Sequence, residues 1–148
     1  MLFEGPEKKV ELAMVPGLPS LRARGHDYWK GIVAKANAQV LSTISNESMD
    51  AYLLSESSLF VTDTWLTMIT CGRTDLVAAV IQLVDDFGTD AFQYLVYERK
   101  NAHHQEYQPS NFFDDCRRLT DRMPAKSYRF GDGDDHHVFL FHLDKPYA

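Results

Sequence analysis

Short segments rich in β-branched and aromatic residues, separated by polar turns, constrain the fold more than any other feature of this sequence. Four of them follow one another before the middle of the chain, over residues 40–45, 51–54, 59–61 and 65–70. The last two segments are separated only by Thr-Asp-Thr, a break that is typical of two strands joined by a turn. This region therefore predicts several short, paired strands.

Helix signals interrupt the strand segments. Residues 26–39 place Tyr28, Trp29, Ile32, Val33 and Ala36 on one helical face. A second helix is expected over residues 76–87, where Thr74 or Asp75 can cap the start and Gly88 lies near the end. The remaining expected elements are strands at 10–15 and 92–97, a helix at 111–122 capped by Ser110, and a closing hairpin from 128–130 and 138–142.

Strand pairs separated by two or three helices are typical of the α+β class. We therefore expect an antiparallel β-sheet with helices packed on one face. The 148 residues suffice for a hydrophobic core, and neither an internal repeat nor a composition shift marks a second unit. The sequence predicts a single domain over residues 1–148.

Charge and hydropathy indicate which partners and which cellular location the protein has. The formal net charge of −6 disfavours binding to nucleic acid or to an anionic membrane, and it suits a cationic small molecule slightly better. The longest apolar run, 76–84, contains Gln82 and is too short to cross a bilayer. The start of the chain turns charged within a few residues and lacks an apolar signal core. We expect a soluble cytoplasmic protein.

The metal-binding and redox residue types form no recognised pattern. Cys71 and Cys116 give no disulfide framework and no metal-ligand spacing, which fits a reducing compartment. The pairs His103-His104 and His136-His137 have no cysteine or carboxylate at ligand spacing. We expect no metal site, and we interpret the histidines as solvated and Cys116 as structural.

Ser-Glu-Ser-Ser, residues 55–58, follows a predicted strand and permits an unusual backbone reaction. A serine hydroxyl at a strained turn can attack the preceding carbonyl, and elimination from the resulting ester then leads to a pyruvoyl group. On its own, this tetrapeptide is also typical of a solvated turn. Likewise Cys71, taken alone, is typical of a small buried hydrophobic residue.

Three motifs in order resemble one enzyme family. Phe-Glu-Gly-Pro-Glu-Lys at residues 3–8, Leu-Ser-Glu-Ser-Ser-Leu-Phe-Val at 54–61 and Thr-Cys-Gly at 70–72 are similar to eukaryotic-type S-adenosylmethionine decarboxylase proenzymes. Arg-Lys-Asn at 99–101 and the segment 138–144 resemble the same family. The resemblance extends over the first half of the family's fold, an α/β-β/α sandwich of two similar halves whose sheets pack face to face.

The resemblance implies a role for each matching residue. The scissile bond is Glu56-Ser57, and Ser57 becomes the pyruvoyl cofactor, which forms a Schiff base with the substrate's amino group. Cys71 matches the catalytic cysteine that protonates the α-carbon after decarboxylation, a task for which we expect a thiol pKa within reach of neutrality. The other matching positions are Phe3, which stacks on adenine; the catalytic carboxylates Glu4 and Glu7; and Leu54, Ser55 and Glu56, which line the substrate.

The function implied is pyruvoyl-dependent decarboxylation of S-adenosylmethionine for spermidine and other polyamines. The family's second half supplies further processing and binding residues, so the chain is expected to pair with a second copy or with a separate second half. Two alternatives remain open. The chain could decarboxylate another amino acid, such as ornithine or arginine, or it could be a non-catalytic regulatory partner of a full-length homologue.

Overall fold

The computed structural model describes residues 7–100, 112–123, 127–132 and 136–142, with backbone alone at residue 100 and from 127 onward. Helices are α1 (His26–Lys35), α2 (Leu76–Phe87) and α3 (Phe112–Arg122), with 3-10 turns η1 (Leu21–Arg24) and η2 (Thr89–Ala91). Strands are β1 (Glu7–Met14), β2 (Val40–Ser45), β3 (Asp50–Leu54), β4 (Ser57–Val61), β5 (Trp65–Thr70), β6 (Phe92–Lys100), β7 (Ser127–Asp132) and β8 (His136–His142).

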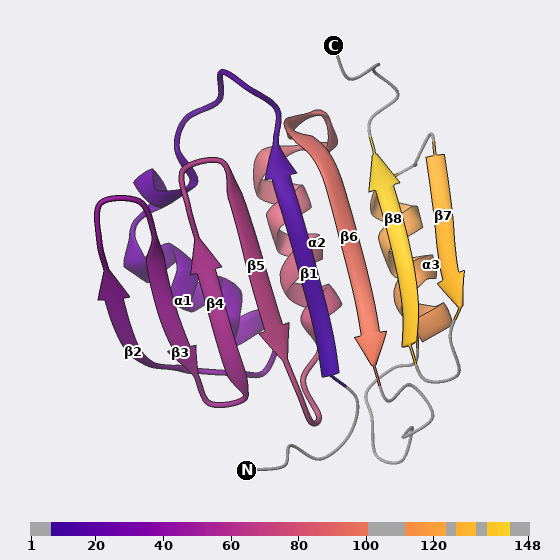
Figure 1. The fold of residues 1–148 in the computed structure, drawn as a ribbon, viewed down its shortest axis with the longest axis horizontal. Helices are drawn as coiled ribbons and strands as arrows, with labels where there is room; N and C mark the ends of the chain where they lie inside the picture. The colour runs from indigo at the N-terminus through magenta and orange to yellow at the C-terminus, as the bar shows by residue number, and fades with distance from the viewer. Residues whose placement is uncertain (1–6, 101–111, 124–126, 133–135, 143–148) are drawn as a thin grey trace.

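The strands form one eight-stranded sheet in the order β2-β3-β4-β5-β1-β6-β8-β7 (Figure 1). Every neighbouring pair is antiparallel. Most neighbours are consecutive in the chain, but β1 lies between β5 and β6. The first strand of the chain thus joins two hairpin-like parts of the sheet.

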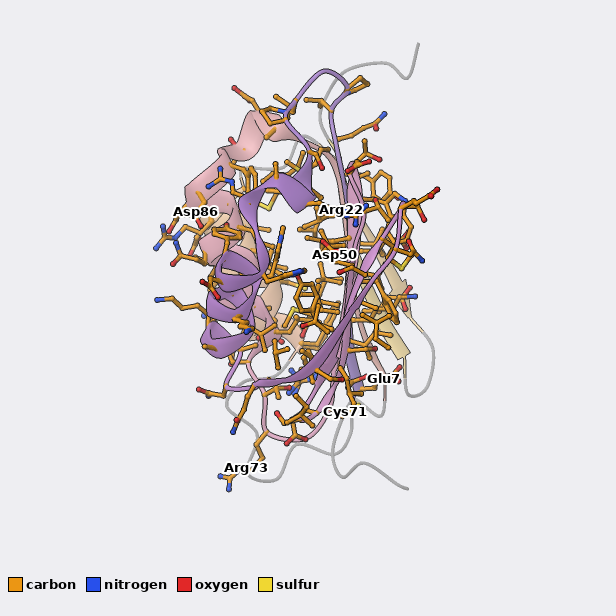
Figure 2. The ribbon with its side chains drawn as sticks, turned by 90° about the vertical axis from the view of Figure 1, so that its left-hand side faces the viewer. Glu7, Arg22, Asp50, Cys71, Arg73 and Asp86 are labelled. Carbon is orange, nitrogen blue, oxygen red and sulfur yellow. The ribbon has the colours of Figure 1, made fainter. Side chains whose placement is uncertain are left out.

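All three helices lie on one face of the sheet, and α2 packs between α1 and α3 (Figures 1 and 2). The expected α+β class, an antiparallel sheet with helices on one face, is confirmed. The other face carries no helix among the described residues, as the side view in Figure 2 shows.

The core fills the space between the helices and the sheet. In β1, burial alternates strictly, so that Lys8, Val10, Leu12 and Met14 point toward the helices. The largest fully buried apolar and aromatic side chains are Trp29, Tyr52, Tyr97, Phe92, Leu12, Leu21, Leu59 and Leu66. The Trp29 indole also donates a hydrogen bond of 3.2 Å to the Leu21 carbonyl, which fixes η1 against α1.

Local sequence signals located several elements correctly. Helix α2 has the expected bounds, and the Asp75 side chain caps it by accepting a hydrogen bond from the Ala78 amide. Gly88 ends it with a φ of 83°, a left-handed value that glycine adopts readily. Strand β2 and the β4–β5 and β7–β8 hairpins are also confirmed.

The expected helix over 26–39 was too long at its C-terminal end. Helix α1 ends at Lys35 because Asn37 takes a left-handed φ of 63°. The amides of Asn37 and Ala38 then bond back to the Ala34 and Val33 carbonyls at 3.1 and 3.3 Å, which closes a Schellman-type end. Asparagine is the common non-glycine residue in this position.

Two strands are longer than expected because charged residues continue them. The strand expected at 10–15 is β1 and begins at Glu7, and the strand expected at 92–97 is β6 and continues to Lys100. Lys8 and Arg99 are direct partners across these two strands. Both side chains are buried and bonded, so their charges do not end the ladder.

Candidate active site

Ser57 begins strand β4, directly after the two-residue connection from β3. Its partner across the ladder is Thr70 on β5, whose partner on the other side is Lys8 of β1, followed by Arg99 of β6. Thr70, Lys8 and Arg99 belong to the helix-facing side, because each continues a set of alternating buried positions. Ser57 thus starts a polar row that runs across four strands beneath the helices.

A second row forms one residue further along, at the end of the sheet. Extending the same registers by one position puts Glu56 and Glu7 on either side of Cys71. The charges of both carboxylates act on the Cys71 thiol, as expected for close neighbours. Figure 2 places Cys71 and Glu7 together at this end. The fold therefore gathers four of the expected site residues, from β1, the β3–β4 connection, β4 and the end of β5.

The Cys71 thiol is protonated at neutral pH. Burial, followed by the negative charge of Glu7, raises its pKa to about 11, with a smaller contribution from Glu56 and an opposing one from Lys8. The expectation of a pKa within reach of neutrality is wrong for this arrangement. A neutral thiol is a poor nucleophile, but it holds the proton that an acid must give to a carbanion.

The loop after Cys71 is held by a buried ammonium group. Lys8 Nζ donates to the carbonyls of Gly72 at 3.0 Å and Thr74 at 2.5 Å. The Thr74 hydroxyl in turn donates to the Cys71 carbonyl at 3.1 Å. Lys8 therefore fixes the backbone on the C-terminal side of Cys71, and it does so from the same strand that carries Glu7.

Lys8 should give the protein a recognisable pH dependence. Burial, with the charge of Arg99 adding to it, lowers the pKa of Lys8 from its ordinary value of 10.5 to about 8. Above pH 8, Lys8 is protonated in a larger fraction of unfolded chains than of native chains. The contribution of Lys8 to the free energy of unfolding therefore rises with pH. Relative to Lys8→Met, the wild-type free energy of unfolding should rise by up to about 1.4 kcal/mol per pH unit between pH 8 and 10.

Urea denaturation of both proteins across this range measures the difference directly. Lys9→Met is the matched control, because Lys9 is the next residue on the same strand and lies on the other sheet face. The free energy of unfolding of Lys9→Met should change with pH in parallel with that of the wild type. Parallel curves for Lys8→Met as well would contradict a lowered pKa at Lys8.

The polar row ends in a buried cluster that joins the sheet to α3. Arg99 donates to Asp115 Oδ2 at 2.9 Å, and the Tyr97 hydroxyl donates to the same oxygen. The side chains of Arg99 and Asp115 are 0% and 1% exposed. Arg118, one turn along α3, pairs with Asp75 at 2.9 Å and so ties α3 to the start of α2. These contacts tie α3 to β6 and to the start of α2.

The other expected site residues are divided between described and undescribed parts. Leu54 is buried among the core residues, and Ser55 is exposed, where its hydroxyl accepts a hydrogen bond of 3.1 Å from the Gln39 amide. Phe3 and Glu4 lie outside the described residues. Substrate contact by these residues stays a prediction.

Among the described residues, no three His, Cys, Asp or Glu side chains gather as a metal site would require. No helix there has the length and apolar character to cross a membrane. Cys116 packs in the core on α3, as expected for a structural cysteine. His103 and His104 fall outside the description, and His136 and His137 are described by backbone alone.

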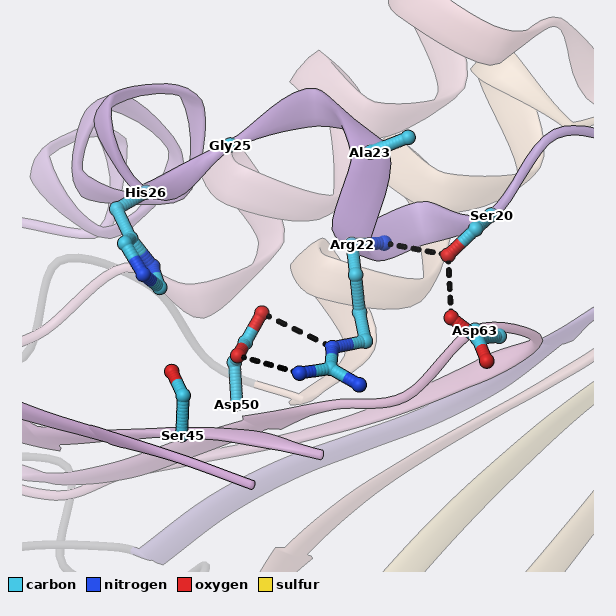
Figure 3. Close-up of a pocket in the computed structure, with 8 residues that line it drawn as sticks. All are labelled: Ser20, Arg22, Ala23, Gly25, His26, Ser45, Asp50 and Asp63. Carbon is cyan, nitrogen blue, oxygen red and sulfur yellow. Dashed lines mark hydrogen bonds and ion pairs between the residues drawn. The ribbon is translucent and has the colours of Figure 1, made fainter. Parts of the chain in front are cut away.

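A polar pocket of about 510 Å³ lies near the opposite end of β3 and β4 (Figure 3). Arg22 dominates it and bonds both Asp50 carboxylate oxygens at 3.3 and 3.1 Å, as well as the Glu47 and Asn46 carbonyls at 2.8 and 2.7 Å. Ser20 donates to Asp63 at 2.5 Å. These groups satisfy one another, so the pocket fixes η1 to the β2–β3 turn and is separate from the candidate site.

Sequence reasoning missed Lys8, Thr70 and Asp115 as members of the site's surroundings. One signal was available: in Glu-Lys-Lys-Val-Glu-Leu, strand alternation puts Lys8 on the same side as Val10 and Leu12. A lysine at an inward position needs buried acceptors. The identity of those acceptors depends on the tertiary fold and could not be read from the sequence.

Sequence similarity relates this chain to known proteins. The family model described as adenosylmethionine decarboxylase matches residues 1–148. Three relatives named S-adenosylmethionine decarboxylase proenzyme, from Leishmania donovani, Trypanosoma cruzi and Xenopus laevis, are 33%, 35% and 31% identical. The alignments cover 96%, 96% and 97% of this chain, but 40%, 41% and 47% of those proteins.

The chain therefore spans less than half the length of these curated relatives. Their sequences nevertheless align with almost all of it. The match over residues 1–148, together with identities above 30%, establishes that this chain belongs to the adenosylmethionine decarboxylase family.

Proposed function

We propose that this chain forms the self-processing half of an S-adenosylmethionine decarboxylase that serves polyamine biosynthesis, with a pyruvoyl group made from Ser57. The observation that carries the proposal is the meeting of Ser57, Glu56, Cys71 and Glu7 at one end of the sheet. These residues come from three segments that are far apart in sequence, so chance is a poor explanation for the grouping. Membership of the family supports the same activity.

The cleavage chemistry uses the chain's own atoms. The Ser57 hydroxyl oxygen bonds to the Glu56 carbonyl carbon as the amide C–N bond breaks, and the proton from the hydroxyl passes to the nitrogen. Loss of the Ser57 α-proton then expels the Glu56 carboxylate and leaves a dehydroalanine. Water adds, ammonia leaves, and a ketone remains at position 57. Ser57 has a φ of 158°, next to the extended region, so the proposed reactivity depends on the neighbouring groups and not on local strain.

Position 57 and its surroundings fit this prosthetic group. When present, a pyruvoyl ketone binds an amine covalently and accepts the electron pair that remains when carbon dioxide leaves. Cys71 lies in the neighbouring row and holds its proton at neutral pH, so it can return a proton to the substrate's α-carbon. Lys8 keeps the Cys71 loop in place through the Gly72 and Thr74 carbonyls.

The charge at this end of the sheet suits the proposed substrate. S-adenosylmethionine carries a sulfonium cation, and Glu7 and Glu56 supply two carboxylates beside Cys71. Opposite charges attract strongly where water is partly excluded. Phe3 and Glu4 precede β1 closely in sequence, and we assign them the adenine and a further catalytic contact by the family resemblance.

A second layer would complete the enzyme. The helix-free face carries several apolar side chains, including Ile44 at 73% exposure and Leu53 at 55%. Phe60, Trp65 and Ile69 follow on the neighbouring strands of the same face. Large exposed apolar faces mark interaction surfaces. We propose that a second copy or a separate second half covers this face, as in the two-half fold of the family.

Mass spectrometry of the purified chain under denaturing conditions tests the function. We expect two fragments, residues 1–56 and 57–148, with the larger one modified by a carbonyl reagent such as phenylhydrazine. Release of carbon dioxide from carboxyl-labelled S-adenosylmethionine, compared with labelled ornithine and arginine, identifies the substrate. A single intact mass that does not react with the hydrazine would contradict the proposal.

A further inference from the structure

The hydroxyl of Thr70 is fully buried, and Thr70 Oγ1 has no hydrogen-bond partner in the part of the chain that the structure describes. Threonine at this inward position follows Leu66 and Met68, which pack in the core. A valine would fill the same space without the cost of removing a hydroxyl from water. Packing therefore does not explain why this position carries a hydroxyl group.

Two neighbours flank Thr70 across the ladder. On the β1 side lies Lys8, whose ammonium already donates to the Gly72 and Thr74 carbonyls. On the β4 side lies Ser57. Leu59 and Val61 of β4 point toward the helices, so Ser57, two positions before Leu59, belongs to the same face as Thr70.

Direct partners in an antiparallel pair hold their β-carbons about 5 Å apart. Two hydroxyls on such β-carbons come within hydrogen-bond distance when one side chain rotates about χ1. The Ser57 side chain is only partly buried, and so it has room for that rotation. Ser57 is thus the reachable partner for the Thr70 hydroxyl.

We propose that Thr70 is a positioning residue for self-cleavage, whose hydroxyl accepts a hydrogen bond from the Ser57 hydroxyl and holds its oxygen toward the Glu56 carbonyl. This inference rests on the proposed function and adds a residue to it. In the step itself, the bond between Ser57 Oγ and the Glu56 carbonyl carbon forms while the C–N bond breaks. The Ser57 proton passes to the nitrogen, and Thr70 keeps its own proton throughout.

The rate of self-cleavage in the full chain tests the role of Thr70. Wild type, Thr70→Val and Thr70→Ser are made by cell-free synthesis, and the appearance of the two fragments is followed by mass spectrometry. Thr70→Val should cleave about tenfold more slowly, the cost of losing one orienting hydrogen bond. Thr70→Ser keeps the hydroxyl and should cleave within about threefold of wild type. Thr67→Val, on the opposite face of the same strand, is the matched control and should match wild type.

Urea midpoints separate positioning from folding. Thr70→Val combined with Ser57→Ala should unfold at the same or a higher urea concentration than Ser57→Ala alone, because both proteins stay uncleaved and the added change removes a buried hydroxyl that has lost its partner. Cleavage of Thr70→Val at the wild-type rate would overturn the inference. Slow cleavage accompanied by a lower midpoint, with Thr70→Ser equally slow, would also overturn it, because the effect would then be structural.

If the wild-type chain stays intact, this result counts against the proposed function. The Ser57–Thr70 contact can still be tested separately. Ser57→Ala, Thr70→Val and the double variant are then compared with the intact wild type by urea denaturation. Non-additive midpoint shifts would support the Ser57–Thr70 hydrogen bond. Additive shifts would overturn it.

Discussion

Ser57→Ala should abolish fragment formation completely, giving one intact mass and no carbon dioxide release from S-adenosylmethionine. Alanine has no oxygen to attack the Glu56 carbonyl, so neither the ester nor the ketone at position 57 can form. Ser57 is partly buried and small, and its truncation should change the free energy of unfolding by less than about 1 kcal/mol. Loss of cleavage without loss of the circular dichroism spectrum would identify a chemical role.

Ser58→Ala provides the matched control for this prediction. Ser58 is the next residue of β4, and its partners across the ladder are Leu53 and Ile69 on the helix-free face. We expect Ser58→Ala to cleave and to release carbon dioxide at rates close to wild type. If Ser58→Ala stops cleavage while Ser57→Ala does not, the scissile bond lies one residue later than proposed.

Asp115→Ala should destabilise the protein by about 3–5 kcal/mol, the range for removing one partner of a buried ion pair. The change leaves the Arg99 guanidinium, 0% exposed, without the carboxylate at 2.9 Å. It also removes the acceptor of the Tyr97 hydroxyl. Urea denaturation followed by circular dichroism, carried out in the uncleaved Ser57→Ala background, measures the loss, which should appear as a lower midpoint with an unchanged slope.

Asp114→Ala tests whether burial is the cause. Asp114 precedes Asp115 on the same helix, but its side chain is exposed, and its loss should cost less than about 1 kcal/mol. A double change, Arg99→Met with Asp115→Leu, removes both buried charges and should recover much of the lost stability. Equal effects of Asp114→Ala and Asp115→Ala would contradict the cluster's assigned role.

Local signals in the sequence predicted elements whose ends are set by neighbouring residues. Helix α2 is the clearest case, because Asp75 caps one end and Gly88 the other. Helix α1 shows the limit: Asn37 ends it, but asparagine occurs in many conformations and is a weaker stop signal than glycine. The extents of β1 and β6 were missed because their charged residues are matched by groups distant in sequence.

For the candidate site too, some features could be predicted from the sequence and others could not. The motif resemblance predicted Ser57, Glu56, Cys71 and Glu7 as site residues, and the strand registers bring these four residues together. The buried hydroxyl of Thr70 could not be anticipated, since a threonine in a strand is unremarkable until its surroundings are known. The Cys71 pKa was predicted in the wrong direction because burial and two nearby carboxylates depend on the assembled fold.

The position of β1 in the sheet has a consequence for the two products of a cut after Glu56. The shorter product would contain β1, α1, β2 and β3, and the longer one all later elements. Strand β1 of the shorter product would lie between β5 and β6 of the longer product. It would be hydrogen-bonded to the longer product along both of its edges. Separation of the two products would require the central strand pairs of the sheet to be broken. The cleaved protein should therefore persist as a non-covalent complex of both products.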